Sequence, residues 1–279
     1  MMMIATGEKE MNKESEKNSI KAVMLDMDGT FYMGNVLLPG ALELMAFLNE
    51  REIPFSFLTN NSSKSADDYV KKLTGLGVKP EDARVYTSGD ATVDYVLREH
   101  ADQKVFLMGT QSLRESFLKA GVCLVEEDPD LVVLGYDTEL TYPVLTRFCD
   151  FVRAGLPYLA THPDVNCPVL GGYAPDIGAM MAMVEASTGR KADLILGKPN
   201  PGIVEGLAFK WGLRNDEILM VGDRLYTDIM MGKTAGVKTA LVLTGEASRV
   251  DLQNAPYQPD WVVEDLFALI HKLKIAKSC

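Results

Sequence analysis

Cysteine is scarce in this chain of 279 residues, and histidine occurs only three times. The four cysteines are Cys123, Cys149, Cys167 and Cys279. They are scattered and form no Cys-x-x-Cys pair, and the histidines have no metal-ligand spacing, which argues against a zinc site and a disulfide framework. Isolated cysteines of this kind are typical of reduced thiols, so we expect a cytoplasmic protein.

Basic residues are also few. The chain has 28 Lys and Arg against 39 Asp and Glu, which gives a formal net charge of −11. This balance argues against nucleic acid or an anionic membrane surface as a partner. A phosphorylated substrate stays open, because a bound divalent cation reverses the sign of a small site.

Long apolar runs are missing as well. No stretch approaches the roughly 18–20 apolar residues that cross a bilayer, so we expect no membrane-spanning segment. The N-terminal residues are Met-rich and then polar and charged, without the apolar core of a signal peptide. We interpret residues 1–17 as a disordered leader.

The rest of the sequence alternates strand-like and helix-like segments. A hydrophobic content of 47% is ordinary for a globular protein, and the length allows more than one domain. Residues 18–102 are predicted to form three strands alternating with helices, which implies a parallel sheet with right-handed crossovers. Residues 103–190 repeat the alternation as a separate unit, and residues 191–279 resume the first pattern. The expected fold class is therefore α/β, with a parallel-sheet core and a second α/β domain.

The stretch Asp26-Met27-Asp28-Gly29-Thr30 ends the first predicted strand. The apolar run 22–25 before it predicts a buried strand, and Asp28-Gly29 predicts a tight turn at the strand's carboxyl end. In open parallel α/β sheets, ligands bind just beyond that end of the strands. Two carboxylates are thus placed where such folds do chemistry, although an acidic, solvated turn would have the same sequence.

Other predicted strands also end in polar or glycine-rich residues. The strand ends are expected to collect one site from Asp26, Asp28, Thr59, Lys198, Asp223 and Asp228. Taken singly, each of these residues has an ordinary structural explanation, such as a helix cap or a solvated surface side chain. Their convergence is much more specific than any one of them.

These residue types suit the transfer of a phosphoryl group to water through a covalent intermediate. Asp26 can attack phosphorus and form an aspartyl phosphate. Asp28 can protonate the leaving oxygen and later take a proton from water. Lys198 and Thr59 offer donors that stabilise charge on the phosphoryl oxygens.

A carboxylate nucleophile and a phosphate repel each other, so this chemistry requires a hard cation. Mg²⁺ prefers oxygen ligands, and one or two carboxylates plus a substrate phosphate usually suffice. Asp26 and Asp223 suit that role, and Asp228 suits a water ligand of the cation. The sequence therefore predicts a magnesium site.

Two short motifs suggest other functions, and both fail on spacing. Gly232-Lys233-Thr234 suggests a P-loop, but Thr227 stands where that motif needs a glycine. The run from Asp26 to Gly29 suggests a calcium-binding EF-hand loop, but its glycine comes fourth instead of sixth. We reject both interpretations.

The ordered motifs resemble those of the haloacid dehalogenase (HAD) superfamily of aspartate-nucleophile phosphatases. They are Asp26-Met-Asp-Gly-Thr30, Thr59-Asn-Asn-Ser62, Lys198 in Gly-Lys-Pro-Asn-Pro, and Gly222-Asp-Arg-Leu-Tyr-Thr-Asp228. The long interval between the second and third motifs resembles the NagD-like, p-nitrophenylphosphatase-type branch (subfamily IIA), which carries an α/β cap there. The resemblance implies a Rossmann-like core at 18–102 and 191–279 and a cap at 103–190.

The resemblance also assigns roles to individual residues. It implies Asp26 as the nucleophile, Asp28 as the acid/base and Lys198 as the group that neutralises charge. The implied metal ligands are Asp26, Asp223, Asp228 and the backbone carbonyl of Asp28. The expected substrate-binding residues are Thr59, Asn60, Asn61, His162, Asp164 and Lys198. His162 and Asp164 belong to a predicted cap loop, 161–168, that could equally be only a rigid turn between prolines.

The expected function is therefore a Mg²⁺-dependent phosphatase of small phosphomonoesters such as a sugar phosphate or a nucleotide. Two alternatives stay open. One is a phosphotransferase or phosphomutase that passes the phosphoryl group to a sugar hydroxyl instead of water. The other is a non-catalytic protein that binds a phosphorylated metabolite. The expected partner is a small phosphorylated metabolite, and a homodimer is possible.

Overall fold

The structure is a computed structural model that describes residues 20–63, 66–169 and 172–276. The predicted disordered leader, residues 1–17, lies outside these ranges. Two compact units make up the chain. Of the described residues, the first unit contains 20–57, 73–84 and 208–276, and the second contains 58–63, 66–72, 85–169 and 172–207. These units are groups of residues in mutual contact and do not test the predicted core at 18–102 and 191–279 or the predicted cap at 103–190.

Six strands form the larger sheet, in the order β14-β13-β12-β1-β4-β5. They are β1 (Ala22–Asp26), β4 (Phe55–Thr59), β5 (Val85–Thr87), β12 (Ile218–Gly222), β13 (Lys238–Val242) and β14 (Trp261–Val263). The pairs β1–β12, β12–β13 and β13–β14 are parallel. β12 is buried along its whole length, as expected of an apolar strand in a sheet covered on both faces.

β1 and β12 are neighbours although they are far apart in the sequence. Their parallel register pairs Met24 with Met220 and Leu25 with Val221. The two strands therefore end side by side, and Asp26 at the end of β1 lies beside the residues that follow β12. This pairing is what assembles the site.

The middle of the chain forms a second parallel sheet, in the order β11-β8-β7-β6. Its strands are β6 (Val105–Met108), β7 (Leu131–Leu134), β8 (Tyr158–Ala160) and β11 (Leu194–Ile195). Phe106, Phe148, Tyr158 and Ile177 are fully buried together at one core of this unit. The predicted α/β fold with a Rossmann-like parallel sheet and an inserted α/β cap is confirmed.

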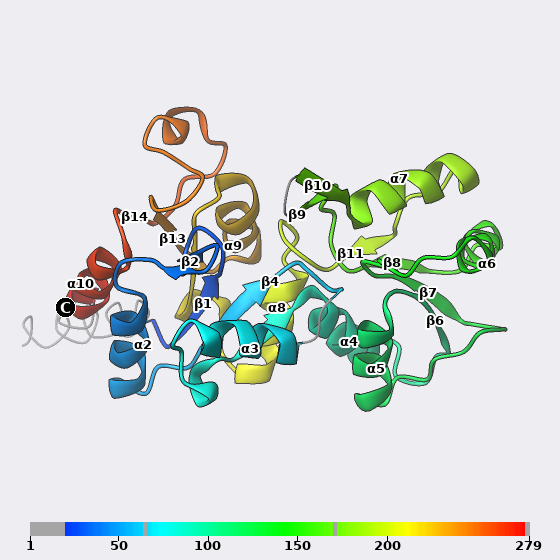
Figure 1. Cartoon of the computed structure of the whole chain (residues 1–279), viewed down its shortest axis with the longest axis horizontal. Coiled ribbons are helices and arrows are strands. Elements are labelled where there is room, and N and C mark those ends of the chain that lie inside the picture. The colour runs from blue at the N-terminus through cyan, green and yellow to red at the C-terminus, as the bar shows by residue number, and fades with distance from the viewer. Residues whose placement is uncertain (1–19, 64–65, 170–171, 277–279) are drawn as a thin grey trace, which may run out of the picture. The chain divides into compact units, whose positions relative to one another are not determined.

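Helices connect most of the strands. They are α2 (Ala41–Glu50), α3 (Ala66–Gly75), α4 (Ser88–Glu99), α5 (Gln111–Lys119), α6 (Tyr142–Arg153), α7 (Ile177–Thr188), α8 (Gly202–Trp211), α9 (Met230–Ala235) and α10 (Leu266–Ala276). α4 begins at Ser88, because Thr87 and Asp90 form a capping box there. α2 and α10 lie side by side in Figure 1, and a Cβ on Gly40 would come 2.6 Å from the backbone nitrogen of Phe267.

Short strands were missed by the sequence analysis. β14 was not predicted, and β2 (Tyr32–Met33) and β3 (Val36–Leu37) form an antiparallel pair after the first motif. β9 (Asn166–Val169) and β10 (Gly172–Pro175) form another. The prediction of a loop over the whole of 161–168 was therefore wrong at its end, where backbone pairing with β10 overrides the turn signal of Pro168.

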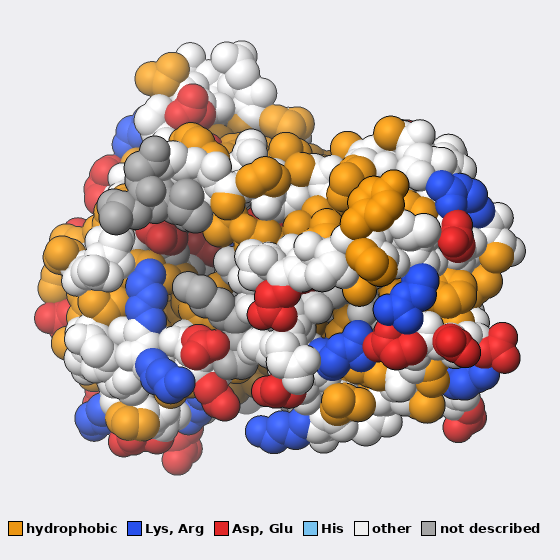
Figure 2. All heavy atoms as spheres, turned by 45° about the vertical axis from the view of Figure 1, so that its right-hand side comes forward, with side chains coloured by type: hydrophobic (Ala, Val, Ile, Leu, Met, Phe, Trp, Pro, Cys, Tyr) orange, Lys and Arg blue, Asp and Glu red, His pale blue; other side chains and the backbone are white. Residues whose placement is uncertain are grey.

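The described helices include none that is long and apolar enough to cross a membrane. On the face drawn in Figure 2, Lys and Arg side chains are interspersed with Asp and Glu side chains. Among the described residues, Cys123, Cys149 and Cys167 take part in no disulfide.

Candidate active site

Three carboxylates gather where β1 and β12 end. Asp26 is the last residue of β1, Asp223 follows β12 directly, and Asp228 lies in the turn after it. Ligand oxygens of the three side chains lie within 4.8 Å of one another, and Asp223 and Asp228 are almost fully buried. Three of the predicted metal-ligating residues are thus brought together in one compact unit.

The turn that carries Asp228 is wider than an α-helical turn. Residues Leu225–Ile229 form a π-helical turn that precedes α9. The N–H groups of Asp228 and Ile229 both donate to the carbonyl of Arg224 at 3.2 Å, and the Arg224 N–H donates back to Asp228 Oδ2 at 3.3 Å. This turn points the Asp228 carboxylate back toward the end of β12. Single π-helical turns of this kind are frequent at functional sites.

Asp223 is fixed by hydrogen bonds from two different elements. Thr30 Oγ1 donates to its Oδ1 at 3.3 Å, and the Glu246 N–H donates to its Oδ2 at 2.8 Å. Burial raises the pKa of Asp223, the Glu246 N–H lowers it, and the charge of Asp228 raises it further. Concentrated negative charge of this kind is stabilised by a bound cation, and an all-oxygen donor set fits a hard cation.

Asp28 lies beside this cluster and is exposed. It lines an open hollow of about 230 Å³. The other lining residues are Gly29, Met33, Asp223, Arg224, Gly245 and Glu246. Two of these lining residues form an ion pair, with Arg224 Nε 3.1 Å from Glu246 Oε2. Asp28 therefore has access to solvent, as a group that exchanges protons requires.

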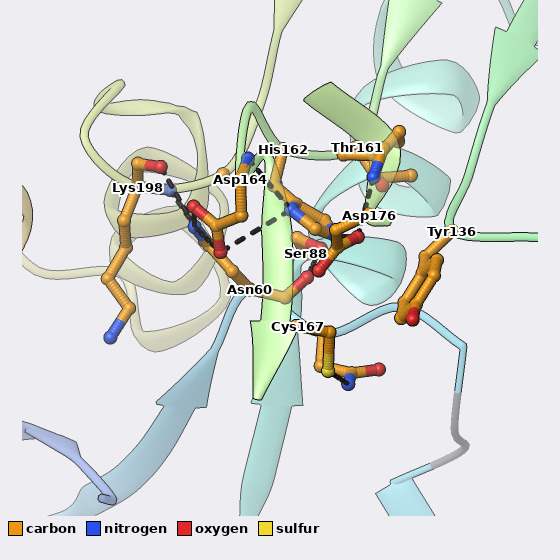
Figure 3. Close-up of polar contacts among 12 residues, drawn as sticks. Asn60, Ser88, Tyr136, Thr161, His162, Asp164, Cys167, Asp176 and Lys198 are labelled. Carbon is orange, nitrogen blue, oxygen red and sulfur yellow. Dashed lines mark hydrogen bonds and ion pairs between the residues drawn. The ribbon is translucent and has the colours of Figure 1, made fainter. Parts of the chain in front are cut away.

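A second polar group centres on Asn60 (Figure 3). Asn60 Oδ1 accepts the backbone N–H of Lys198 at 2.8 Å, and its Nδ2 donates to the Lys198 carbonyl at 2.9 Å. Nδ2 also lies 3.1 Å from both carboxylate oxygens of Asp164. Asn60 and Lys198 are both buried. The predicted substrate-binding residues Asn60, Asp164 and Lys198 are thus neighbours.

Thr59 and Asn61 flank Asn60. Thr59 Oγ1 accepts the Asn61 N–H at 3.2 Å, and the Tyr69 hydroxyl forms a hydrogen bond with Thr59. Asn61 Oδ1 accepts from the N–H and the hydroxyl of Ser63, and its Nδ2 donates to Cys167 Sγ at 3.8 Å. These contacts hold the segment after β4 in a defined turn.

His162 lies behind Asp164 and is fully buried. Its Nδ1 accepts the Asp164 N–H at 3.4 Å, and its Nε2 lies 3.6 Å from Asp176 Oδ1 without a hydrogen-bond partner among the described residues. Burial lowers the pKa of His162 to about 3, so its contacts with the two carboxylates are not ion pairs. Burial also raises the pKa of Asp176 to about 7.

Ligand atoms of His162, Asp164 and Asp176 also lie within 4.8 Å of one another. The two carboxylates face different nitrogens of the ring, with Asp164 near Nδ1 and Asp176 near Nε2. These contacts join the loop after β8 to Asp176, the residue before α7.

The predicted site residues thus form two groups, one in each compact unit. Asp26, Asp28, Asp223 and Asp228 lie in the first, and the others lie in the second. The sequence analysis missed Thr30, Thr244, Gly245 and Glu246 around Asp223, as well as Asp176 beside His162. Thr244-Gly245 follows the end of β13, so the strand-end rule that selected the other residues could have found it.

Two family models match the chain. A haloacid dehalogenase-like hydrolase model matches residues 23–123, and a HAD-hydrolase-like model matches residues 195–269. An acid sugar phosphatase of Staphylococcus epidermidis is 34% identical over 255 residues, which cover 91% of this chain and 98% of that protein.

Solved structures give the same assignment. The crystal structure of a 4-nitrophenylphosphatase from Thermotoga maritima is 48% identical, with a TM-score of 0.85 over 91% of this chain and 98% of that one. NagD from E. coli K-12 is 33% identical, with a TM-score of 0.82 over 89% and 97%. The chain belongs to the haloacid dehalogenase-like hydrolases. Within that family it is an enzyme of the NagD-like phosphatase type.

Proposed function

We propose that this protein is a Mg²⁺-dependent phosphatase that hydrolyses small phosphomonoesters through an aspartyl-phosphate intermediate. The observation that carries the proposal is the group of three carboxylates, Asp26, Asp223 and Asp228, whose oxygens lie within 4.8 Å of one another. Membership of a family of hydrolases that includes phosphatases supports the same reaction.

The proposed first step is a displacement at phosphorus. A carboxylate oxygen of Asp26 bonds to phosphorus while the bond from phosphorus to the ester oxygen breaks, and Asp28 gives that oxygen its proton. The oxygen of a water molecule then bonds to the phosphorus of the aspartyl phosphate while the bond from phosphorus to the Asp26 oxygen breaks, and Asp28 takes a proton from the water. The products are an alcohol and inorganic phosphate, and both aspartates return to their starting states.

Asp26, Asp223 and Asp228 would hold Mg²⁺, with the backbone carbonyl of Asp28 as a further ligand. When bound, the cation offsets the repulsion between Asp26 and the phosphate and stabilises charge on the phosphoryl oxygens. The raised pKa of Asp223 supports this assignment, because a buried carboxylate beside another favours either a proton or a cation.

Lys198, Thr59, Asn60 and Asn61 are the proposed phosphate-binding residues. Lys198 is buried, and its backbone is fixed on both sides of the residue by the Asn60 amide, which supports a defined position for the ammonium group. Substrate contact by Asp164 and His162 stays a prediction. The complete burial of His162 supports a positioning role for it, because its ring has no exposed atom.

The names of the relatives favour a sugar phosphate as the natural substrate class, with a nucleotide or similar phosphomonoester as the alternative. p-Nitrophenyl phosphate is a convenient artificial substrate, since related solved structures are named for it. A cytoplasmic location and a homodimer remain proposals that fractionation and light scattering can test.

The test is hydrolysis of p-nitrophenyl phosphate and of a panel of sugar phosphates with Mg²⁺ or with EDTA. We expect Mg²⁺-dependent phosphate release that Asp26→Asn abolishes. Asp150→Asn is the control, since this exposed carboxylate on α6 pairs only with Arg153 among the described residues. Undiminished turnover in Asp26→Asn would contradict the proposal. Isomer formation without phosphate release would indicate a mutase, and recovery of intact ligand a binding protein.

A further inference from the structure

A turn after β13 encloses the carboxylate cluster from a side that none of the four motifs covers. It consists of Thr244, Gly245 and Glu246. Thr244 Oγ1 donates to the backbone carbonyl of Gly29 at 2.7 Å, and the Glu246 N–H donates to Asp223 Oδ2 at 2.8 Å. The turn is therefore bonded to the segment after β1 and to the residue after β12 at once.

The fit around Asp223 leaves no space for a side chain on either side. A Cβ on Gly245 would lie 2.0 Å from Asp223 Oδ2, and a Cβ on Gly29 would lie 2.4 Å from the same atom. Gly29 also has a φ of 85°, which L side chains rarely adopt. Asp223 Oδ2 therefore lies against two glycines, one in the segment after β1 and one in the turn after β13, and the Thr244 hydroxyl bonds these two segments together.

We infer that the turn Thr244–Glu246 is a positioning element of the cation site. Glu246 and Gly245 fix the rotation of the Asp223 carboxylate, and Thr244 fixes the Gly29–Thr30 peptide in the turn after Asp28. The inference depends on the proposed function, because it takes Asp26, Asp223 and Asp228 as the cation ligands.

Preformed geometry matters here because the ligands repel one another. Oxygens of Asp26, Asp223 and Asp228 lie within 4.8 Å of one another, so without restraint the like charges would push the Asp223 side chain away from the other two. Bonds from outside the ligand set oppose that movement, and partners of this kind typically change metal affinity 10- to 100-fold in other proteins. Thr244 should therefore affect cation binding without contacting the substrate.

The experiment measures cation affinity of the full-length protein, freed of metal, by Mn²⁺ and Mg²⁺ titration calorimetry without substrate. Thr244→Val removes the hydroxyl and keeps the shape, and Thr244→Ser keeps the hydroxyl. The control is Thr239→Val, the same substitution on β13, where the Thr239 hydroxyl bonds to Asp260 away from the site. Gly245→Ala provides a steric test, with Gly75→Ala as its control because a Cβ there meets nothing within 4 Å.

We expect Thr244→Val to bind Mn²⁺ about 10-fold more weakly than the wild type, with Thr244→Ser close to wild type. The Mn²⁺ affinity of Gly245→Ala should fall further, about 100-fold below that of the wild type. Thr239→Val should melt at a lower temperature and keep its cation affinity. Thermal unfolding of each variant confirms that a folded protein was titrated, and Gly245→Ala serves if Thr244→Val does not fold.

The inference would be overturned if Thr244→Val and Gly245→Ala both bound the cation with wild-type affinity. A loss of cation affinity in Asp223→Asn in the same experiment would leave the proposed cation site intact. If the wild type binds neither cation, the proposed site and the inference both fail. An equal loss in Thr239→Val would show a general effect of destabilising β13 and would also overturn the inference.

Discussion

The side-chain amide of Asn60 bonds to both backbone groups of Lys198, accepting the N–H at 2.8 Å and donating to the carbonyl at 2.9 Å. The Nδ2 atom of Asn60, which donates to that carbonyl, also donates to the Asp164 carboxylate. One side chain therefore joins the end of β4, the lysine segment and the loop after β8. Only an amide of this length can donate and accept in these directions at once.

Replacing Asn60 by Asp should destabilise the protein. The substitution keeps the acceptor for the Lys198 N–H but turns the donor into an oxygen that faces a carbonyl and the Asp164 carboxylate. We expect a loss of about 2–4 kcal/mol in the free energy of unfolding, because buried acceptors are left opposed. Urea denaturation measures it. Asn61→Asp is the control, since Asn61 Oδ1 keeps its bonds to Ser63 and only a weak contact with Cys167 is lost. Equal losses in the two variants would show that the pairing with Lys198 is not responsible.

Gly178 in α7 should not tolerate alanine. A Cβ there would lie 2.4 Å from the carbonyl oxygen of Pro163 and 2.9 Å from that of Asp164. We expect Gly178→Ala to lower the free energy of unfolding by about 1–3 kcal/mol, although alanine is the better helix former. Gly75→Ala in α3 should be neutral or stabilising by up to about 1 kcal/mol, because that position is open. A Gly178→Ala protein as stable as the wild type would mean that the loop after β8 yields easily.

Asp176 should make stability depend on pH near neutrality. Burial raises its pKa from 3.8 to about 7, so ionisation is harder in the folded than in the unfolded chain. Stability from this group is fully present below about pH 4 and is lost as the pH rises through about 7. The charged groups and titrating side chains near it are Asp164, His162, Tyr69 and Tyr136. His162, with a pKa lowered to about 3, stays neutral throughout this range.

The free energy of unfolding of Asp176→Asn should therefore increase relative to that of the wild type as the pH rises. Asparagine keeps an acceptor for the Ile177 N–H but carries no charge. The difference in free energy of unfolding between variant and wild type should change by several kcal/mol from pH 4 to pH 8, since each pKa unit corresponds to about 1.4 kcal/mol. Denaturant titrations at several pH values measure it. A difference independent of pH would refute a raised pKa at Asp176.

Asp228 should have opposite effects with and without a cation. Its charge raises the pKa of buried Asp223, so Asp228→Asn relieves repulsion in the metal-free protein. We expect the variant to melt at the same or a higher temperature than the wild type in EDTA. In excess Mg²⁺ the order should reverse, because a cation present at about 100 times its Kd stabilises the wild type by about 2.7 kcal/mol. A variant that gains as much from Mg²⁺ as the wild type would remove Asp228 from the proposed ligands.

The long apolar strands and the polar residues at their ends could be predicted from the sequence. Residues 22–25 of β1 and 218–221 of β12 are apolar runs, and Asp26 and Asp223 just after these runs mark the end where parallel sheets bind ligands. Asp26, Asp223 and Asp228 were brought together for these reasons. The adjacency of β1 and β12 was not predicted and is seen in the sheet order of the structure.

Other features depend on tertiary contacts and leave no local signal. The strands of the β2–β3 and β9–β10 pairs have two to four residues, so periodicity cannot reveal them. His162 stands in a polar, proline-flanked segment that suggests exposure, yet it is fully buried against Asp176. The bond from the Glu246 N–H to Asp223 uses a backbone group, which no side-chain motif records.

The wide turn over Leu225–Ile229 has one further consequence, which concerns chain length. A π-helical turn holds about one residue more than an α-helical turn. Deleting exposed Tyr226 would thus allow a regular helix, which is more favourable locally, while rotating Asp228 away from Gly222 and Asp223 by roughly a quarter of a turn or more. This segment therefore accepts many substitutions at Tyr226 but has a fixed number of residues. Deletion of a single codon there would give a protein that still folds but has lost the position of Asp228 in the site.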